Sequence, residues 1–74
     1  MYIKLENTFR AAEVIRIAKE NKMDVVFERD GEHGTDDLEI VLMFQEAGFK
    51  YTISHYKGSY EKNAIRVEFH YVEG

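Results

Sequence analysis

The chain has 74 residues, and none of them is cysteine. Disulfide bonds and thiolate metal sites are therefore excluded, which fits a reducing compartment. A domain of this length buries only about 60% of its unfolded surface, so its stability depends on one small apolar core or on assembly with another chain. We expect a single domain over residues 1–74.

Two spacings of apolar residues predict the secondary structure. Residues 1–6 alternate between apolar and polar, as in a strand with one buried face. Residues 8–22 change to a helical period, with Ala11, Val14, Ile15 and Ala18 in one stripe. Four further segments carry the branched, aromatic or alternating residues of strands: 24–30, 38–44, 49–57 and 64–72. We expect an α+β fold in the order β-α-β-β-β-β, with one amphipathic helix packed on one face of a mainly antiparallel five-stranded sheet.

The last two predicted strands can be aligned by matching their side chains. Pairing residues whose numbers sum to 118 sets Phe49 opposite Phe69 and Ile53 opposite Ile65. A shift by one residue would mix the two faces of the hairpin. We therefore expect an antiparallel hairpin in this register.

A single helix leaves the second face of such a sheet uncovered. A helix of about 15 residues is ~22 Å long and ~10 Å wide, which is enough for one face of a small sheet. The predicted open face is half apolar, and its apolar side chains include Val26, Val41, Met43 and Tyr56. Two interpretations remain: an ordinary surface with scattered apolar residues, or a patch that binds a second copy or a partner.

Negative charge is concentrated in the middle of the chain. The net charge is −4, and residues 25–48 hold one basic residue against seven acidic ones. The predicted hairpin in this region carries Glu28, Glu32, Asp36, Asp37 and Glu39. Such an acidic focus attracts basic protein surfaces and repels nucleic acid phosphates.

The sequence contains no motif that indicates catalysis or a cofactor. The acidic loop 30–37 could meet a cation, but Gly34 and Thr35 stand where a calcium loop needs a ligand and a glycine. His33 among carboxylates is a poor zinc site. Ser54 and Ser59 lack a nucleophile motif, and no glycine-rich phosphate loop is present. We expect neither an enzyme nor a bound metal or cofactor.

These observations favour a small non-enzymatic protein-binding module. We expect a homodimer, or a stoichiometric inhibitor or adaptor of the phage or mobile-element type, whose basic partner contacts the acidic hairpin and the open-face patch. The alternative is a single-stranded nucleic-acid-binding protein that stacks bases on its C-terminal hairpin. That hairpin is aromatic and basic, with Tyr51, His55, Tyr56, Lys57, Tyr60, Lys62, Arg66, His70 and Tyr71.

The termini and apolar runs predict a cellular location. The longest apolar run, residues 40–44, is too short to span a membrane, and the N-terminus lacks the apolar segment of a signal peptide. Because the sequence also begins at Met1, we expect a full-length cytoplasmic protein.

Overall fold

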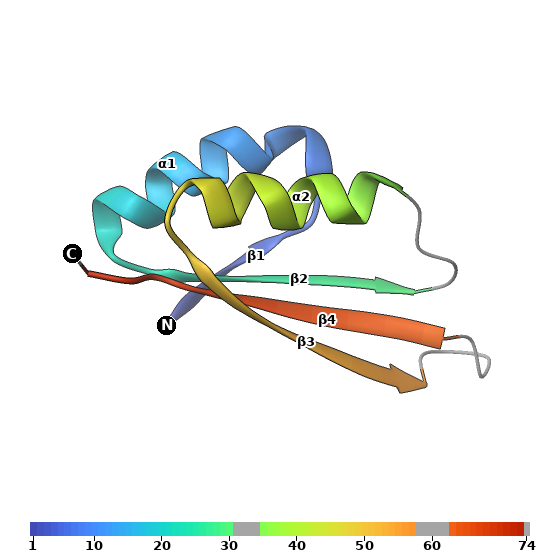
Figure 1. Ribbon diagram of the computed structural model, residues 1–74. Coiled ribbons are helices and arrows are strands. Elements are labelled where there is room, and N and C mark those ends of the chain that lie inside the picture. Colours follow the sequence, from blue (N-terminus) through green and yellow to red (C-terminus); the bar gives the residue numbers. More distant parts are fainter. Residues whose placement is uncertain (31–34, 58–62, 74) are drawn as a thin grey trace.

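The structure, a computed structural model, describes residues 1–30, 35–57 and 63–73. Their elements are β1 (Tyr2–Leu5), the 3₁₀ turn η1 (Thr8–Arg10), α1 (Ala11–Asn21), β2 (Asp24–Asp30), α2 (Thr35–Glu46), β3 (Lys50–Lys57) and β4 (Asn63–His70). Both helices lie on the same side of the sheet, so the described part of the chain forms two layers (Figure 1).

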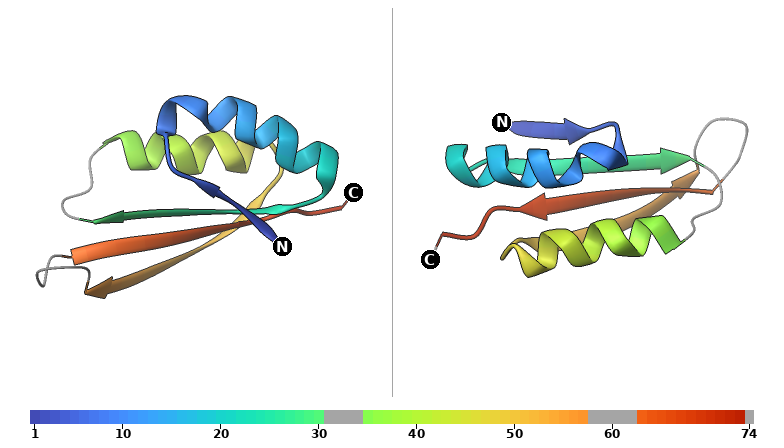
Figure 2. Two further views of the ribbon diagram at one scale, coloured as in Figure 1. Left: turned by 180° about the vertical axis from the view of Figure 1, so that it is seen from behind. Right: turned by 90° about the horizontal axis from the view of Figure 1, so that it is seen from above.

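The sheet is mixed, and its strand order is β1-β2-β4-β3. β1 runs parallel to β2, whereas β4 lies between β2 and β3 and runs antiparallel to both. Each helix therefore connects two strands that point in the same direction. Seen from above, α1 follows the half of the sheet that holds β1 and β2, and α2 follows the other half (Figure 2, right).

The α+β class is confirmed, but the prediction of five strands and one helix is wrong. Residues 38–44, expected to be a strand, belong to α2, so the order is β-α-β-α-β-β. Apart from Glu39, this segment is apolar on every side, and such a run suits a strand and a buried helix equally well. In the helix, Ile40 and Phe44 lie one turn apart and are both buried. In addition, β2 pairs with β4 and not with the segment that follows it in the chain.

The predicted hairpin of β3 and β4 is present, in a register shifted by two residues. Opposite residues sum to 120, so Tyr51 and not Phe49 faces Phe69. Phe49 precedes β3, and its backbone N–H donates to the Phe44 carbonyl at 3.0 Å, which closes the end of α2. Because an even shift keeps every side chain on its face, the two faces of the hairpin are as expected although its register is not.

The core fills the space between the helices and the sheet. The Phe44 ring stacks on Phe69 of β4, with centroids 3.9 Å apart and planes 8° apart, and Phe49 meets it edge-on at 5.3 Å. On α1, Ala11 and Ala18 are fully buried, and such small side chains allow that helix to approach the sheet closely. The remaining buried core residues are Leu5, Val25, Phe27, Ile40, Ile65, Val67 and Phe69.

Candidate functional site

The residues predicted to contact a partner are divided between the two sides of the sheet. The predicted acidic hairpin is wrong as a structure, because Asp36, Asp37 and Glu39 belong to helix α2, whereas Glu28 belongs to β2. Glu32, with residues 31–34 of the acidic loop, lies outside the described residues.

The predicted apolar patch on the open face is also wrong. Val41 and Met43 lie on α2, on the opposite side of the sheet, and Val41 packs against the core. Val26 does lie on β2 with its side chain toward the open face, but it is only 4% exposed between its cross-strand partners Lys4 and Glu68. Tyr56 is on β3, opposite Ala64.

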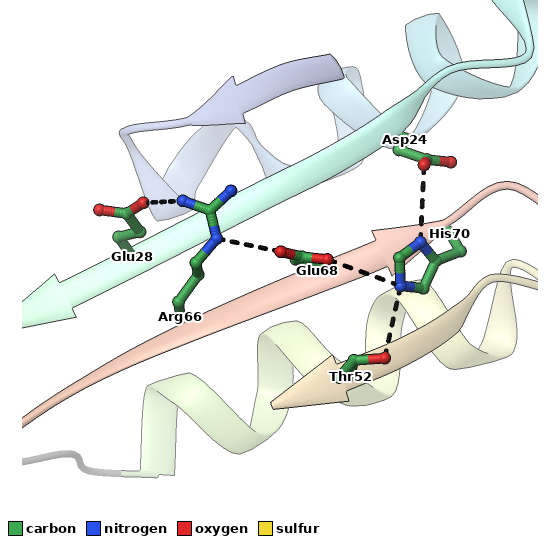
Figure 3. Close-up of polar contacts among 6 residues, drawn as sticks. All are labelled: Asp24, Glu28, Thr52, Arg66, Glu68 and His70. Carbon is green, nitrogen blue, oxygen red and sulfur yellow. Dashed lines mark hydrogen bonds and ion pairs between the residues drawn. The ribbon is translucent and has the colours of Figure 1, made fainter. Parts of the chain in front are cut away.

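Charged side chains cover the centre of the open face. Arg66 of β4 donates through Nε to Glu68 Oε1 at 3.1 Å and through its terminal nitrogen to Glu28 of β2 (Figure 3). The Glu68 carboxylate raises the pKa of the Arg66 guanidinium by accepting this bond, and the partial burial of the group opposes that effect. The guanidinium is therefore already shared between two carboxylates of the same face.

His70 extends this polar row toward β3. Its Nδ1 lies 3.5 Å from Asp24 Oδ2, and its Nε2 lies 3.4 Å from Thr52 Oγ1 and 3.9 Å from Glu68 Oε2 (Figure 3). Asp24 also accepts the backbone N–H of Tyr71 at 2.9 Å. Among the residues that the structure describes, no three His, Cys, Asp or Glu side chains are grouped so that they could hold a metal ion. The row therefore consists of side chains that bind one another across the strands.

Among the hairpin side chains that the structure describes, the tyrosines do not share a face with the lysine and arginine residues. Tyr51 is on the helix side of β3, whereas Arg66 and His70 are on the open side of β4. Tyr71 packs edge-on against Phe49 at 6.3 Å. A base-stacking platform needs exposed rings beside free cations on one surface. The described part of the hairpin separates these two requirements.

In the part of the chain that the structure describes, two hollows lie beside the helices. The larger, of about 320 Å³, is lined by Lys19, Ala47, Gly48, Phe49, Tyr71 and Val72. The smaller, of about 160 Å³, is lined by Thr8, Phe9, Glu39, Ile40 and Met43. Small-molecule sites usually occupy about 300–1,000 Å³ and gather several polar groups. The described lining of the larger hollow offers one amine and one phenol, without a carboxylate or imidazole to form an acid–base pair.

The outer edge of β3 is the longer of the two edges of the sheet. β3 has eight residues, and its register with β4 is continuous from Lys50 to Lys57. No charged residue, proline or glycine stands between these two lysines, although such residues commonly protect an edge. On its helix side, Tyr51 is 42% and Ile53 43% exposed.

The flank of α2 continues this apolar surface. Glu39 and Met43 line the hollow beside Phe9, so they mark the side of α2 that faces η1. Helical geometry places Leu38 and Val41 on the opposite side, toward β3. Leu38 is 66% exposed and Val41 is partly buried. We call the outer backbone edge of β3, together with Leu38, Val41, Tyr51 and Ile53, the β3-edge surface.

Sequence reasoning missed this surface for a definite reason. A strand over 38–44 would have paired with residues 49–57 and covered the edge that is now exposed. The helix that replaces it leaves β3 at the end of the sheet. The run Thr35-Asp36-Asp37, a helix-capping residue type followed by two acidic residues, is a start signal that could have indicated α2.

Comparison of the chain with protein-family models, with curated proteins and with solved structures finds no match. Neither helix in the described part of the chain is long and apolar enough to cross a membrane.

Proposed function

We propose that this protein is a small non-enzymatic binding module that acts by strand addition at the β3-edge surface. In this mode an extended segment of another protein molecule pairs with an exposed strand. Backbone hydrogen bonds provide affinity, and alternate side chains provide specificity. The observation that carries the proposal is the eight-residue outer edge of β3, which has no internal charge and presents Tyr51 and Ile53 half exposed.

The charge distribution supports a protein partner over a nucleic acid. β3 carries two lysines, but Arg66 is shared between two carboxylates, and the net charge of the chain is −4. Phosphate binding needs several cations on one surface. Strand addition needs only an available backbone edge and nearby apolar side chains, and it suits a stoichiometric inhibitor or an adaptor.

A displayed library of short random peptides tests this function. Peptides selected on the wild-type protein should bind in an extended conformation. Their binding should protect the backbone amide protons of β3 from exchange with solvent. Ile53→Lys should weaken their binding at least tenfold. The matched control is Tyr2→Lys on β1, the opposite edge, where Tyr2 is also exposed.

Two results would contradict the proposed function. The first is a library without binders, or binders that are insensitive to Ile53→Lys. The second is an oligonucleotide that binds at low salt and is released steeply as salt is added, which would favour the nucleic-acid alternative.

A further inference from the structure

We propose that the occupant of the β3-edge surface is a second copy of this chain, paired antiparallel about a two-fold axis at Ile53. This inference rests on the proposed function and specifies its partner. Closed two-fold dimers are the commonest assemblies of soluble proteins. Joining two β3 strands would give a continuous eight-stranded sheet with all four helices on one side.

The alternation of side chains restricts the register. Residues that face each other across a sheet point to the same side, so the helix-facing positions 51, 53 and 55 must pair among themselves. The sum of two opposing residue numbers is therefore even. A sum of 106 sets Ile53 opposite itself, Tyr51 opposite His55, and Thr52 opposite Ser54, and it uses seven residues of the strand.

The charges of β3 are compatible with this register. Like charges directly opposite each other destabilise a strand pair. In the 106 register position 50 lies opposite position 56 of the second copy, so Lys50 faces a tyrosine position and not a lysine, and residue 57 lies beyond the end of the pairing. The described acidic groups of the polar row (Asp24, Glu28 and Glu68) are on the open face, away from the helices. Among the described residues, the contact therefore sets no like charges directly opposite each other, although each copy carries −4.

The position of α2 explains why a second copy fits better than a lone peptide. Phe44 stacks on Phe69, so α2 lies above β4, one strand inside the edge. In the dimer the two β4 strands are three strand spacings apart, about 14 Å. Helices in direct contact are about 8–10 Å apart. The space between the two α2 helices would be filled by Tyr51 and Ile53 of both copies, together with Leu38 and Val41 of each α2. A single added strand would leave the helix flank uncovered.

The size of the contact predicts a reversible dimer. The contact is limited to one strand and four side chains per copy, and interfaces below about 1,200 Å² for both partners are typical of weak complexes. We therefore expect dissociation on dilution, and the mass must be measured from micromolar to millimolar concentration. Sedimentation equilibrium of the full chain should give twice the 8.7 kDa chain mass at the upper end. Ile53→Lys should weaken the dimer at least tenfold, whereas Tyr2→Lys should not change it.

Single cysteines test the register, because the natural chain has none. A disulfide needs Cα atoms about 4.4–6.8 Å apart, and directly opposite residues of an antiparallel pair are about 4.5–5.5 Å apart. Ile53→Cys should therefore form a disulfide dimer under mild oxidation. Thr52→Cys and Ser54→Cys, which do not face themselves in this register, should remain largely monomeric. Circular dichroism shows that each variant is folded.

Three outcomes would overturn the inference. These are a folded wild-type chain that stays monomeric at millimolar concentration, a dimer unaffected by Ile53→Lys, and cross-linking of Thr52→Cys or Ser54→Cys in place of Ile53→Cys. A monomer that still binds library peptides through Ile53 would leave the proposed function intact. A monomer that binds no peptide would remove both.

Discussion

The two edges of the sheet differ in length and in protection. β1 has four residues, includes Lys4, and pairs with a parallel neighbour. β3 has twice that length, pairs with an antiparallel neighbour, and carries no charge between its terminal lysines. Short and charged edges resist the addition of another strand, whereas long uncharged edges promote it. The difference favours β3 over β1 as the edge for the proposed strand addition.

The two halves of the molecule are also anchored differently. On the β3 side an aromatic group of Phe44, Phe49 and Phe69 joins α2 to the sheet. On the β1 side α1 contributes alanines, and Leu5 is the buried residue of the edge strand. The exposed edge thus belongs to the half of the molecule in which aromatic side chains anchor the helix.

Removing these anchors should give the largest effect. Phe44→Ala should lower the free energy of unfolding by about 3–5 kcal/mol, because the cavity would lie beneath both Phe49 and Phe69. Leu5→Ala, also buried, should cost about 2–4 kcal/mol. Urea denaturation followed by circular dichroism measures both. A loss below about 1 kcal/mol for Phe44→Ala would contradict the packing described for the β3 half.

The ends of the two helices provide a second comparison. α1 is followed by Lys22, at φ 53° and ψ 50°, and α2 is followed within two residues by Gly48, at φ 98°. Positive φ is accessible to glycine but strained for other residues. A Cβ at Gly48 would meet no atom within 4 Å, so only the backbone opposes a substitution there.

Exchanging the residue types should therefore act in opposite directions. Gly48→Ala should destabilise the protein by about 1 kcal/mol. Lys22→Gly should stabilise it by about 0.5–1 kcal/mol, because glycine adopts this positive φ without strain. The ion pair from Lys22 to Glu73 that the substitution removes is exposed and contributes little. Thermal unfolding of both variants is the measurement. Shifts of the same sign would show that backbone strain does not distinguish the two ends.

The polar row on the open face (Asp24, Glu28, Thr52, Arg66, Glu68 and His70) should contribute less to the stability of the protein. Arg66 connects β2 and β4 through Glu28 and Glu68, and its side chain is about one-third exposed. Arg66→Gln should lower the urea midpoint by less than Gly48→Ala does, and added salt should reduce the difference, because exposed ion pairs are screened. Arg10→Gln, which breaks the exposed pair with Glu13, is the control and should have no measurable effect. A salt-independent loss for Arg66→Gln would indicate a packing role.

The sequence predicts the parts of this fold in which local periodicity determines structure. β1, α1, β2 and the final hairpin follow from alternation or from a helical stripe, and the faces of the hairpin are right although its register is not. The helix α2 could not be predicted in this way. Its apolar run has no period, and its buried face is selected by Phe69, which lies 25 residues after Phe44.

The candidate surface depends on this nonlocal information. Val41 was predicted as a contact residue and does belong to the β3-edge surface, but on a helix flank and not on a sheet face. The exposed edge of β3 exists only because β4 inserts between β2 and β3, and strand order is a property of the whole sheet. The sequence of β3 indicates a strand, but it does not indicate that this strand lies at the edge of the sheet.

The smallest expected effect on stability separates assembly from folding. Ile53→Lys and Tyr2→Lys each replace an exposed side chain on an edge strand, so each should change the free energy of unfolding of the monomer by less than about 0.5 kcal/mol. Urea denaturation at a concentration where the chain is monomeric measures this change. At high concentration only wild type and Tyr2→Lys should gain stability, because association stabilises the folded state by mass action. If Ile53→Lys also became more stable at high concentration, the chain would associate through another surface. The difference between the β1 and β3 edges would then not explain its assembly.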